Sequence, residues 1–251
     1  MNKKAVLELR SVYKRFTTSG NELKVLENIS LSIYAGEIVA LVGPSGCGKT
    51  TLLNIAADLL KPNQGDVVQR QNLRTAYIFQ EPRLLPWKTA EANISFVQDS
   101  FLPPEEAAVV RADLLRKTGL APFRDAFPAQ LSGGMKQRLE IIRALSVKPE
   151  LLLMDEPFKS LDIDLKYQLQ ELILEQYAQD QFAVLFITHD PEEAVMMADR
   201  VILLTDKPAR IHREITIEQR RQERSLKDQK IYHKLEEILG FLLKKDIQQA
   251  Y

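Results

Sequence analysis

Short apolar runs typical of strands alternate along this chain with longer patterns typical of helices. The alternation divides the chain into three stretches. Near the N-terminus, strand-like runs stand at Val6–Leu9, Ile29–Ile33 and Glu37–Val42, with turn signals between them. Residues 67–68 and 75–79 are typical of two further strands. The N-terminal stretch is therefore expected to be rich in β-structure.

The pattern changes near Gln80, where a mostly helical stretch begins. The segment Glu81–Trp87 carries two prolines, so an irregular crossing segment is expected there. Helical patterns follow at residues 89–97, 105–118 and 135–147. Residues 87–149 are therefore predicted to form a helical subdomain inserted into a strand-containing fold.

Strand patterns return at residues 151–154, 183–187 and 201–204, with helical patterns at 164–181 and 191–198 between them. This alternation predicts an α/β fold with a largely parallel sheet and helices on both faces. Residues 1–86 and 150–217 would form the core of one domain spanning residues 1–251. The tail, residues 218–251, is charged and then amphipathic. It predicts a helix packed on the core, with a partner-binding role as the alternative.

Composition narrows the functional classes. Apolar residues make up 45% of the 251 residues, which allows a substantial core. The 34 basic and 34 acidic residues balance, so nothing in the charge points to nucleic acid as a partner. The single cysteine, Cys47, excludes intramolecular disulfides and suits a reducing compartment. No signal peptide or membrane span is expected, which predicts a protein that is soluble and intracellular by itself.

The segment Gly43–Thr51 reads G-P-S-G-C-G-K-T-T and fits G-x-x-x-x-G-K-[ST], a loop that wraps the phosphates of ATP or GTP. A strand pattern precedes it and a helix pattern follows it, which is the context that the motif requires. The alternative is an ordinary glycine-rich turn before a helix, with no nucleotide bound.

The chemistry of this loop follows from its backbone. Its glycines allow successive N–H groups to point inward as an anion nest, and the helix N-terminus adds further donors. Lys49 is placed to reach the β- and γ-phosphates, and the Thr50 hydroxyl to ligate Mg²⁺. The predicted nucleotide-binding residues here are Gly43, Pro44, Ser45, Gly46, Cys47, Gly48, Lys49, Thr50 and Thr51.

An apolar strand pattern ends in two carboxylates, Asp155 and Glu156. In a phosphate-loop ATPase a strand-end aspartate completes the Mg²⁺ shell, and the next residue can polarise the attacking water. An acidic turn after a strand is common. The pair therefore indicates an ATPase site only because a phosphate loop lies upstream.

The run Leu131–Met135, L-S-G-G-M, is the most discriminating stretch. It resembles the LSGGQ signature of ATP-binding-cassette (ABC) transporter ATPases, with Met135 in place of glutamine. Ser132, Gly133 and Gly134 at a helix N-terminus would make a second anion site. Two phosphate sites in one chain make sense if two copies face head to tail. The resemblance therefore implies a dimer, most simply a homodimer.

The resemblance covers essentially the whole chain and implies an N-terminal antiparallel β subdomain, ATP and Mg²⁺ as cofactors, and further site residues. Phe16 matches the aromatic residue that stacks on adenine, with Tyr13 as the weaker candidate. Gln80 matches the glutamine that touches Mg²⁺ and the attacking water. Asp162 matches the aspartate of the dimer-contacting loop, and His189 the histidine that contacts the γ-phosphate. The implied catalytic residues are Glu156, His189, Gln80 and Lys49, and the implied metal ligands are Thr50, Gln80 and Asp155.

The sequence also departs from the family pattern. Met135 removes an amide from the signature but leaves its backbone N–H groups. Lys159 and Ser160 stand where two small residues are usual, which places a cation near the expected dimer seam. The effect of that cation is open at the level of sequence.

Residues 80–87 are similar to the corresponding segment of importer ATPases of the nitrate, sulfonate and taurine type. The resemblance implies two transmembrane permease subunits, an indirect link to an extracytoplasmic solute-binding protein, and a peripheral location on the cytoplasmic face of the membrane. A groove of Arg83, Leu84, Leu85 and Trp87 would receive the permease. The alternative is a soluble ABC ATPase acting in DNA repair or translation. A small-molecule kinase is weaker still, because it leaves the signature unexplained.

Overall fold

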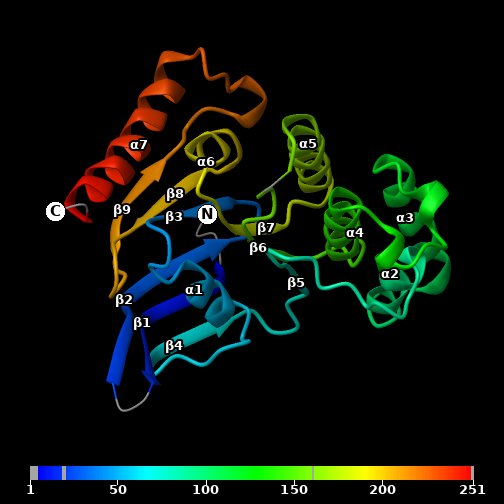
Figure 1. The fold of residues 1–251 in the computed structure, drawn as a ribbon, viewed down its shortest axis with the longest axis horizontal. Coiled ribbons are helices and arrows are strands. Elements are labelled where there is room, and N and C mark those ends of the chain that lie inside the picture. The colour runs from blue at the N-terminus through cyan, green and yellow to red at the C-terminus, as the bar shows by residue number, and fades with distance from the viewer. Residues whose placement is uncertain (1–4, 19–20, 160, 250–251) are drawn as a thin grey trace. The chain divides into compact units, whose positions relative to one another are not determined.

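The computed structural model describes residues 5–18, 21–159 and 161–249. The chain forms two compact units (Figure 1). The first unit comprises the chain up to Leu73 and from Ala183 onward, and the second comprises Arg74–Phe182. Each unit is described by itself.

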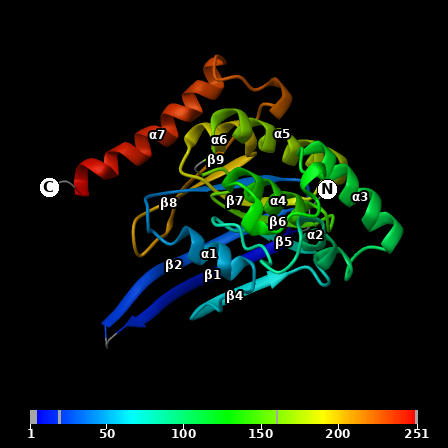
Figure 2. The same cartoon turned by 45° about the vertical axis from the view of Figure 1, so that its right-hand side comes forward.

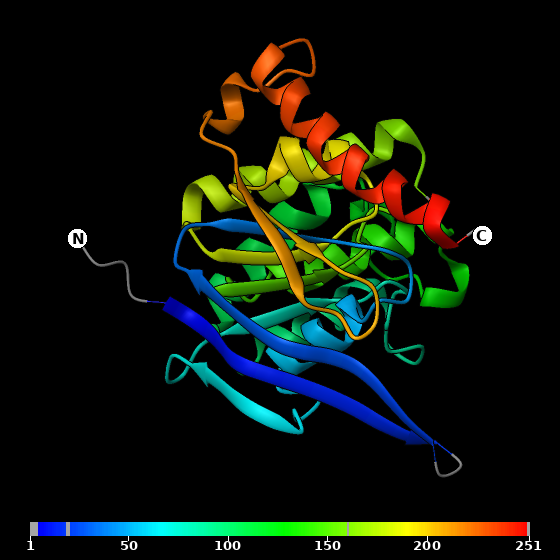
Figure 3. The same cartoon turned by 90° about the vertical axis from the view of Figure 1, so that its left-hand side faces the viewer.

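One sheet of the first unit is antiparallel, with strand order β2-β1-β4 (Figure 3, blue and cyan). Strand β1 spans Ala5–Thr18 and pairs with both β2 (Asn21–Tyr34) and β4 (Gln64–Gln69). Gly65 permits the close approach of β4, because a Cβ there would lie 2.2 Å from the Ser11 carbonyl oxygen. This sheet provides the predicted antiparallel subdomain.

The other strands of the first unit carry the phosphate loop. Strands β7 (Ala183–Ile187), β3 (Ile38–Val42) and β8 (Arg200–Leu204) run parallel, and β9 (Ile211–Thr216) is antiparallel to β8. Every residue of β3 and β7 is buried, as expected for strands covered on both faces. Helix α1 (Lys49–Ala56) packs on β7, and α6 (Pro191–Met197) packs on β3.

The second unit is mainly helical (Figure 2, green). It contains one parallel pair, β5 (Thr75–Ile78) with β6 (Leu151–Asp155). Its helices and short 3₁₀ turns are α2 (Ala90–Gln98), α3 (Pro104–Lys117), η1 (Ala121–Phe123), η2 (Pro128–Gln130), α4 (Gly133–Leu145) and α5 (Ile163–Asp180). The proline-rich segment that precedes α2 is irregular, as predicted.

Asn93 explains how this irregular segment is held. Its side chain is fully buried and accepts a hydrogen bond from the Leu85 N–H at 2.8 Å. Its amide group also donates to the backbone carbonyls of Leu85, Lys88 and Thr89, at 3.0 to 3.2 Å. One side chain thus replaces the backbone pairing that the two prolines prevent.

The predicted α/β class, with a mostly parallel sheet, an antiparallel part and a helical part, is confirmed. Three strands differ from the sequence pattern. Strand β1 continues well beyond Leu9 and β2 begins well before Ile29, because the two strands pair with each other along polar stretches. Strand β9 lacks a strong apolar pattern, since it lies at a sheet edge and pairs with β8. The division into residues 1–86 with 150–217, 87–149 and 218–251 stays a prediction.

The C-terminal tail contains η3 (Arg221–Glu223) and helix α7 (Gln229–Gln249), which packs on α6. Ile231, Leu235 and Ile238 are buried, whereas Leu239 and Leu243 are exposed. The predicted amphipathic helix is therefore present and covers the core with one face. In the described part of the chain, none of the helices has the length and apolar character needed to cross a membrane.

Candidate functional site

The phosphate loop connects β3 to α1 in the first unit. Gly46 and Gly48 have φ of +73° and +121°, and a Cβ at Gly48 would lie 2.8 Å from Val25 Cγ1. No side chain of the described residues caps the start of α1. The N–H groups of the first helical turn can therefore donate to an anion, with the positive end of the helix dipole behind them.

Lys49 is held inside this loop. Its side chain is almost fully buried, and Nζ donates to the carbonyl oxygens of Gly43 and Pro44, both at 2.8 Å. Cys47 is also buried, with Sγ 4.0 Å from the same Nζ. Ser45, Gly46 and Thr50 are exposed on the loop. The buried ammonium therefore has a fixed position, while the outer rim offers hydroxyl and N–H groups to a polyphosphate.

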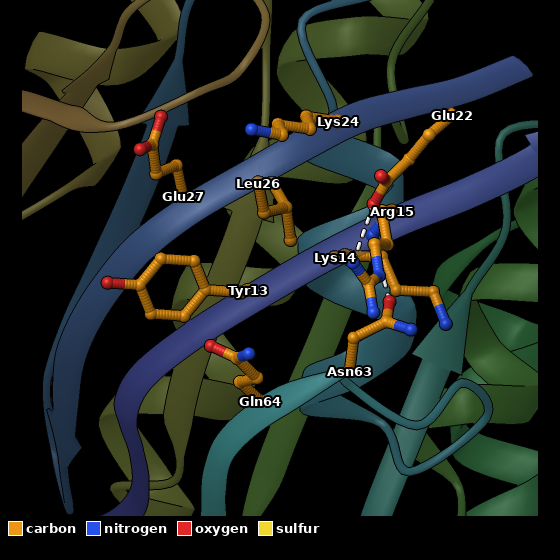
Figure 4. Close-up of a pocket in the computed structure, with 9 residues that line it drawn as sticks. All are labelled: Tyr13, Lys14, Arg15, Glu22, Lys24, Leu26, Glu27, Asn63 and Gln64. Atoms are coloured by element: carbon orange, nitrogen blue, oxygen red, sulfur yellow. Dashed lines mark hydrogen bonds and ion pairs between the residues drawn. The ribbon is translucent and has the colours of Figure 1, made fainter.

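Both aromatic candidates lie on β1, and one of them, Tyr13, lines a cavity of about 200 Å³. Figure 4 shows Tyr13 at this cavity, and Arg15 between Glu22 and Asn63. Phe16 is 38% exposed, and Lys14 Nζ lies 5.2 Å from its ring centroid. Tyr13 thus lines the cavity, whereas Phe16 is partly exposed with an ammonium over its ring.

His189 belongs to the same unit and lies two residues beyond the end of β7, after Thr188. The side chain is exposed, in a short loop before α6. Its neighbour Thr188 is buried, donates its hydroxyl hydrogen to Glu193, and accepts a hydrogen bond from the Asp190 N–H at 2.9 Å. The flanking residues are thereby fixed, and the imidazole projects from a defined position.

The carboxylates Asp155 and Glu156 lie in the second unit, at the end of β6. Asp155 is 4% exposed, and its charge adds to burial in raising the pKa of Tyr77 on the adjacent strand. Glu156 has φ of +47°, and its carboxylate forms an ion pair with Lys159 Nζ at 2.7 Å. The turn after β6 therefore sets the direction of the Glu156 side chain.

Gln80 is exposed and lies just beyond β5. The residues around it are anchored by aromatic contacts. Phe79 stacks on Tyr77 at a centroid distance of 4.2 Å, and the Arg83 guanidinium lies 4.0 Å from the Phe79 ring centroid. Gln80 is therefore carried on a short segment whose neighbours are fixed while its own amide is accessible.

The signature residues form the N-terminus of α4. Ser132 is the N-cap, and its hydroxyl accepts a hydrogen bond from the Met135 N–H at 3.3 Å. Gly133 is exposed at the first helical position. Asp162 caps α5 in the same manner, accepting from the Leu165 N–H at 2.9 Å. Gln137 reaches from α4 to the Pro157 carbonyl at 2.8 Å, which ties the signature helix to the turn that holds Glu156.

The predicted site residues are thus distributed over both units. The first unit holds Phe16, the loop Gly43–Thr51 and His189, and the second holds Gln80, Ser132–Met135, Asp155, Glu156 and Asp162. The individual roles of these residues stay predictions. What the sequence interpretation missed is the contact between Lys159 and Glu156. The available signal was a lysine three residues after a glutamate in a turn.

The donor set suits Mg²⁺. A threonine hydroxyl, a glutamine amide oxygen and an aspartate carboxylate are the oxygen ligands that this ion prefers. Within the described residues, no group of three or more His, Cys, Asp or Glu side chains could hold a metal ion. The assignment of Thr50, Gln80 and Asp155 as Mg²⁺ ligands stays a prediction.

Comparison with known proteins agrees with this assembly of motifs. The family model described as ABC transporter matches residues 26–159. An aliphatic sulfonates import ATP-binding protein of Pseudomonas syringae is 41% identical over 213 residues, covering 85% of this chain and 86% of that protein. A nitrate transport protein of Klebsiella oxytoca is 34% identical over 261 residues, covering 98% of this chain and 100% of that protein.

A solved structure gives the same result for the fold and the chemistry. It is a dimeric post-hydrolysis state of an ATP-binding cassette bound to ADP and Pi. It matches with a TM-score of 0.73 and 29% identity, and covers 85% of this chain and 100% of that one. With the phosphate loop, the strand-end carboxylates and the capped signature helix in place, this chain belongs to the ABC transporter family, as one of its ATPases.

Proposed function

We propose that this chain is the ATP-hydrolysing subunit of an importer that takes up a small oxyanion, of the nitrate, sulfonate or taurine type. The observation that carries the proposal is the near full-length similarity to relatives named for sulfonate import and nitrate transport. The uptake route would be a separate transmembrane permease, served by an extracytoplasmic solute-binding protein that determines the solute.

The proposed chemistry assigns one task to each group. The loop N–H groups and Lys49 hold the β- and γ-phosphates and stabilise the charge that develops during transfer. Mg²⁺ would neutralise phosphate charge at Thr50, Gln80 and Asp155. Glu156 accepts a proton from the attacking water, and His189 contacts the γ-phosphate.

Coupling requires a second copy of the chain. Ser132 and the N–H groups of Gly133 and Gly134 would close over the nucleotide held by the other copy, with Asp162 at the seam. Support comes from the exposed helix N-terminus and from the dimeric state of the related cassette. ATP would shift the population toward the closed dimer because it binds that state better, and hydrolysis would reverse the shift.

The permease would dock on the segment Arg83–Trp87. Trp87 is 70% exposed, and Asn93 fixes the backbone behind it. A large exposed aromatic on a rigid segment is typical of the centre of a protein interface. The subunit would then lie on the cytoplasmic face of the membrane as a peripheral protein.

Co-expression tests the transporter assignment. The chain should sediment with membranes when permease subunits are co-expressed and stay in the supernatant without them. In vesicles containing permease and binding protein, the cognate solute should stimulate ATP hydrolysis, and Glu156→Gln should abolish it while trapping an ATP-bound dimer. Membrane association in neither case would favour the soluble DNA-repair or translation alternative.

A further inference from the structure

The side chain of Lys159 contacts the carboxylate that is proposed to activate water. Its Nζ lies 2.7 Å from Glu156 Oε2. The Glu156 side chain is 10% exposed, whereas that of Lys159 is 50% exposed. The carboxylate therefore has a fixed and sheltered place, and the ammonium remains half in water.

The backbone produces this contact. Glu156 adopts a left-handed conformation, and the Lys159 N–H donates to the Glu156 carbonyl at 3.1 Å, which closes a turn. The turn is anchored from below by the buried Phe158 ring and by the hydrogen bond from Gln137 to the Pro157 carbonyl. The anchors leave the Lys159 side chain on the outer side, within reach of the Glu156 carboxylate.

The two side chains differ in what separation would cost. Lys159 can return to water with little loss, because a half-exposed ammonium keeps much of its hydration and gains rotamer freedom. The Glu156 side chain has less room to move, because only 10% of it is exposed. The pair can therefore open by movement of the lysine alone.

We propose that Lys159 is a positioning residue that restrains Glu156, so that the carboxylate activates water only after the lysine has moved away. This inference rests on the proposed role of Glu156. A carboxylate oxygen engaged by an ammonium at 2.7 Å is a hindered acceptor for a proton from water. In the proposed function, water is activated at the γ-phosphate of ATP, and the negative charge of that polyphosphate can compete with the Glu156 carboxylate for the lysine.

The expected effect is modest because the lysine is half exposed. Pairs of this kind contribute little in water, so Lys159→Ala should raise kcat for ATP hydrolysis by about 2- to 5-fold. KM for ATP should not change, because Lys159 is not assigned to nucleotide binding. Lys159→Arg retains the cation and should hydrolyse at the parent rate. Lys227→Ala, which removes an exposed lysine elsewhere, is the matched control and should also match the parent.

The test measures ATP hydrolysis by the purified full-length chain at saturating Mg-ATP. A purely structural role of Lys159 would lower kcat in Lys159→Ala, whereas release of the restraint raises it.

Two failures can be distinguished. If Glu156→Gln hydrolyses ATP at the parent rate, the assignment of Glu156 in the proposed function is wrong. If Glu156→Gln is inactive but Lys159→Ala is no faster than the parent, the restraint by Lys159 is refuted and the proposed function stands.

Discussion

Gly48 is the position where a single methyl group should damage the nucleotide loop most. Its φ of +121° is disfavoured for every residue with a Cβ, and an alanine Cβ would lie 2.8 Å from Val25 Cγ1 and 3.1 Å from Leu26 Cδ2. Strained backbone costs about 1–3 kcal/mol, and forced overpacking costs a similar amount. Because Val25 can shift in part, Gly48→Ala should lower the free energy of unfolding by about 2–4 kcal/mol.

The same substitution should weaken ATP binding. If the loop relieves its strain by moving, the N–H groups leave the geometry that suits phosphate, and every 1.4 kcal/mol lost corresponds to about tenfold in affinity. We expect at least a tenfold rise in Kd for ATP. Urea unfolding followed by circular dichroism measures the first effect, and binding of a fluorescent ATP analogue measures the second.

Gly240→Ala is the matched control for stability. Gly240 lies within α7, has no heavy atom within 4 Å of an added Cβ, and has no positive φ. Alanine there should stabilise the protein by about 0.5–1 kcal/mol, since glycine is unfavourable inside a helix. A loss of less than about 1 kcal/mol for Gly48→Ala, or unchanged ATP affinity, would contradict the strain argument.

Three further changes test other parts of the structure. Arg143→Met should lower the free energy of unfolding by about 3 kcal/mol, because it leaves the fully buried Glu140 carboxylate without its ion-pair partner. Adding Glu140→Leu to the same chain should restore most of this loss, as measured by urea unfolding. Burial already holds the pKa of Glu140 above its usual value, so that the group stabilises the fold below its unfolded pKa of about 4.3 and loses this contribution as pH rises through the folded pKa. The deficit of Arg143→Met should therefore be smaller at low pH than at pH 8, and a pH-independent deficit would contradict this. Asp162→Ala removes the N-cap hydrogen bond from the Leu165 N–H and should lower the free energy of unfolding by about 1 kcal/mol. An unchanged melting temperature would show that the cap is dispensable. Trp87→Ala should change the free energy of unfolding by no more than about 0.5 kcal/mol, because the ring is exposed. It should nevertheless abolish solute-stimulated ATP hydrolysis in vesicles. Full stimulation would show that Trp87 is not part of the permease-docking surface.

The sequence by itself determined the fold class and the candidate chemistry. The loop Gly43–Thr51, the carboxylates at the end of β6 and the glycines that open α4 are local patterns. Each specifies its own backbone geometry through residues close in the chain. The buried strands were equally predictable, because β3 and β7 are apolar over all five residues and β6 is apolar over its first four.

Only the tertiary structure decided which backbone and side-chain groups pair with one another. The polar half of β1 is a strand because β2 pairs with it, and β9 because β8 does. Asn93 appeared as an ordinary helix residue, although its buried amide holds the segment before α2. Lys159 was an unexplained cation in the sequence. The turn after β6 brings the Lys159 ammonium to the Glu156 carboxylate. The path of the backbone through that turn decides which charged side chains meet, and no residue type encodes this path alone.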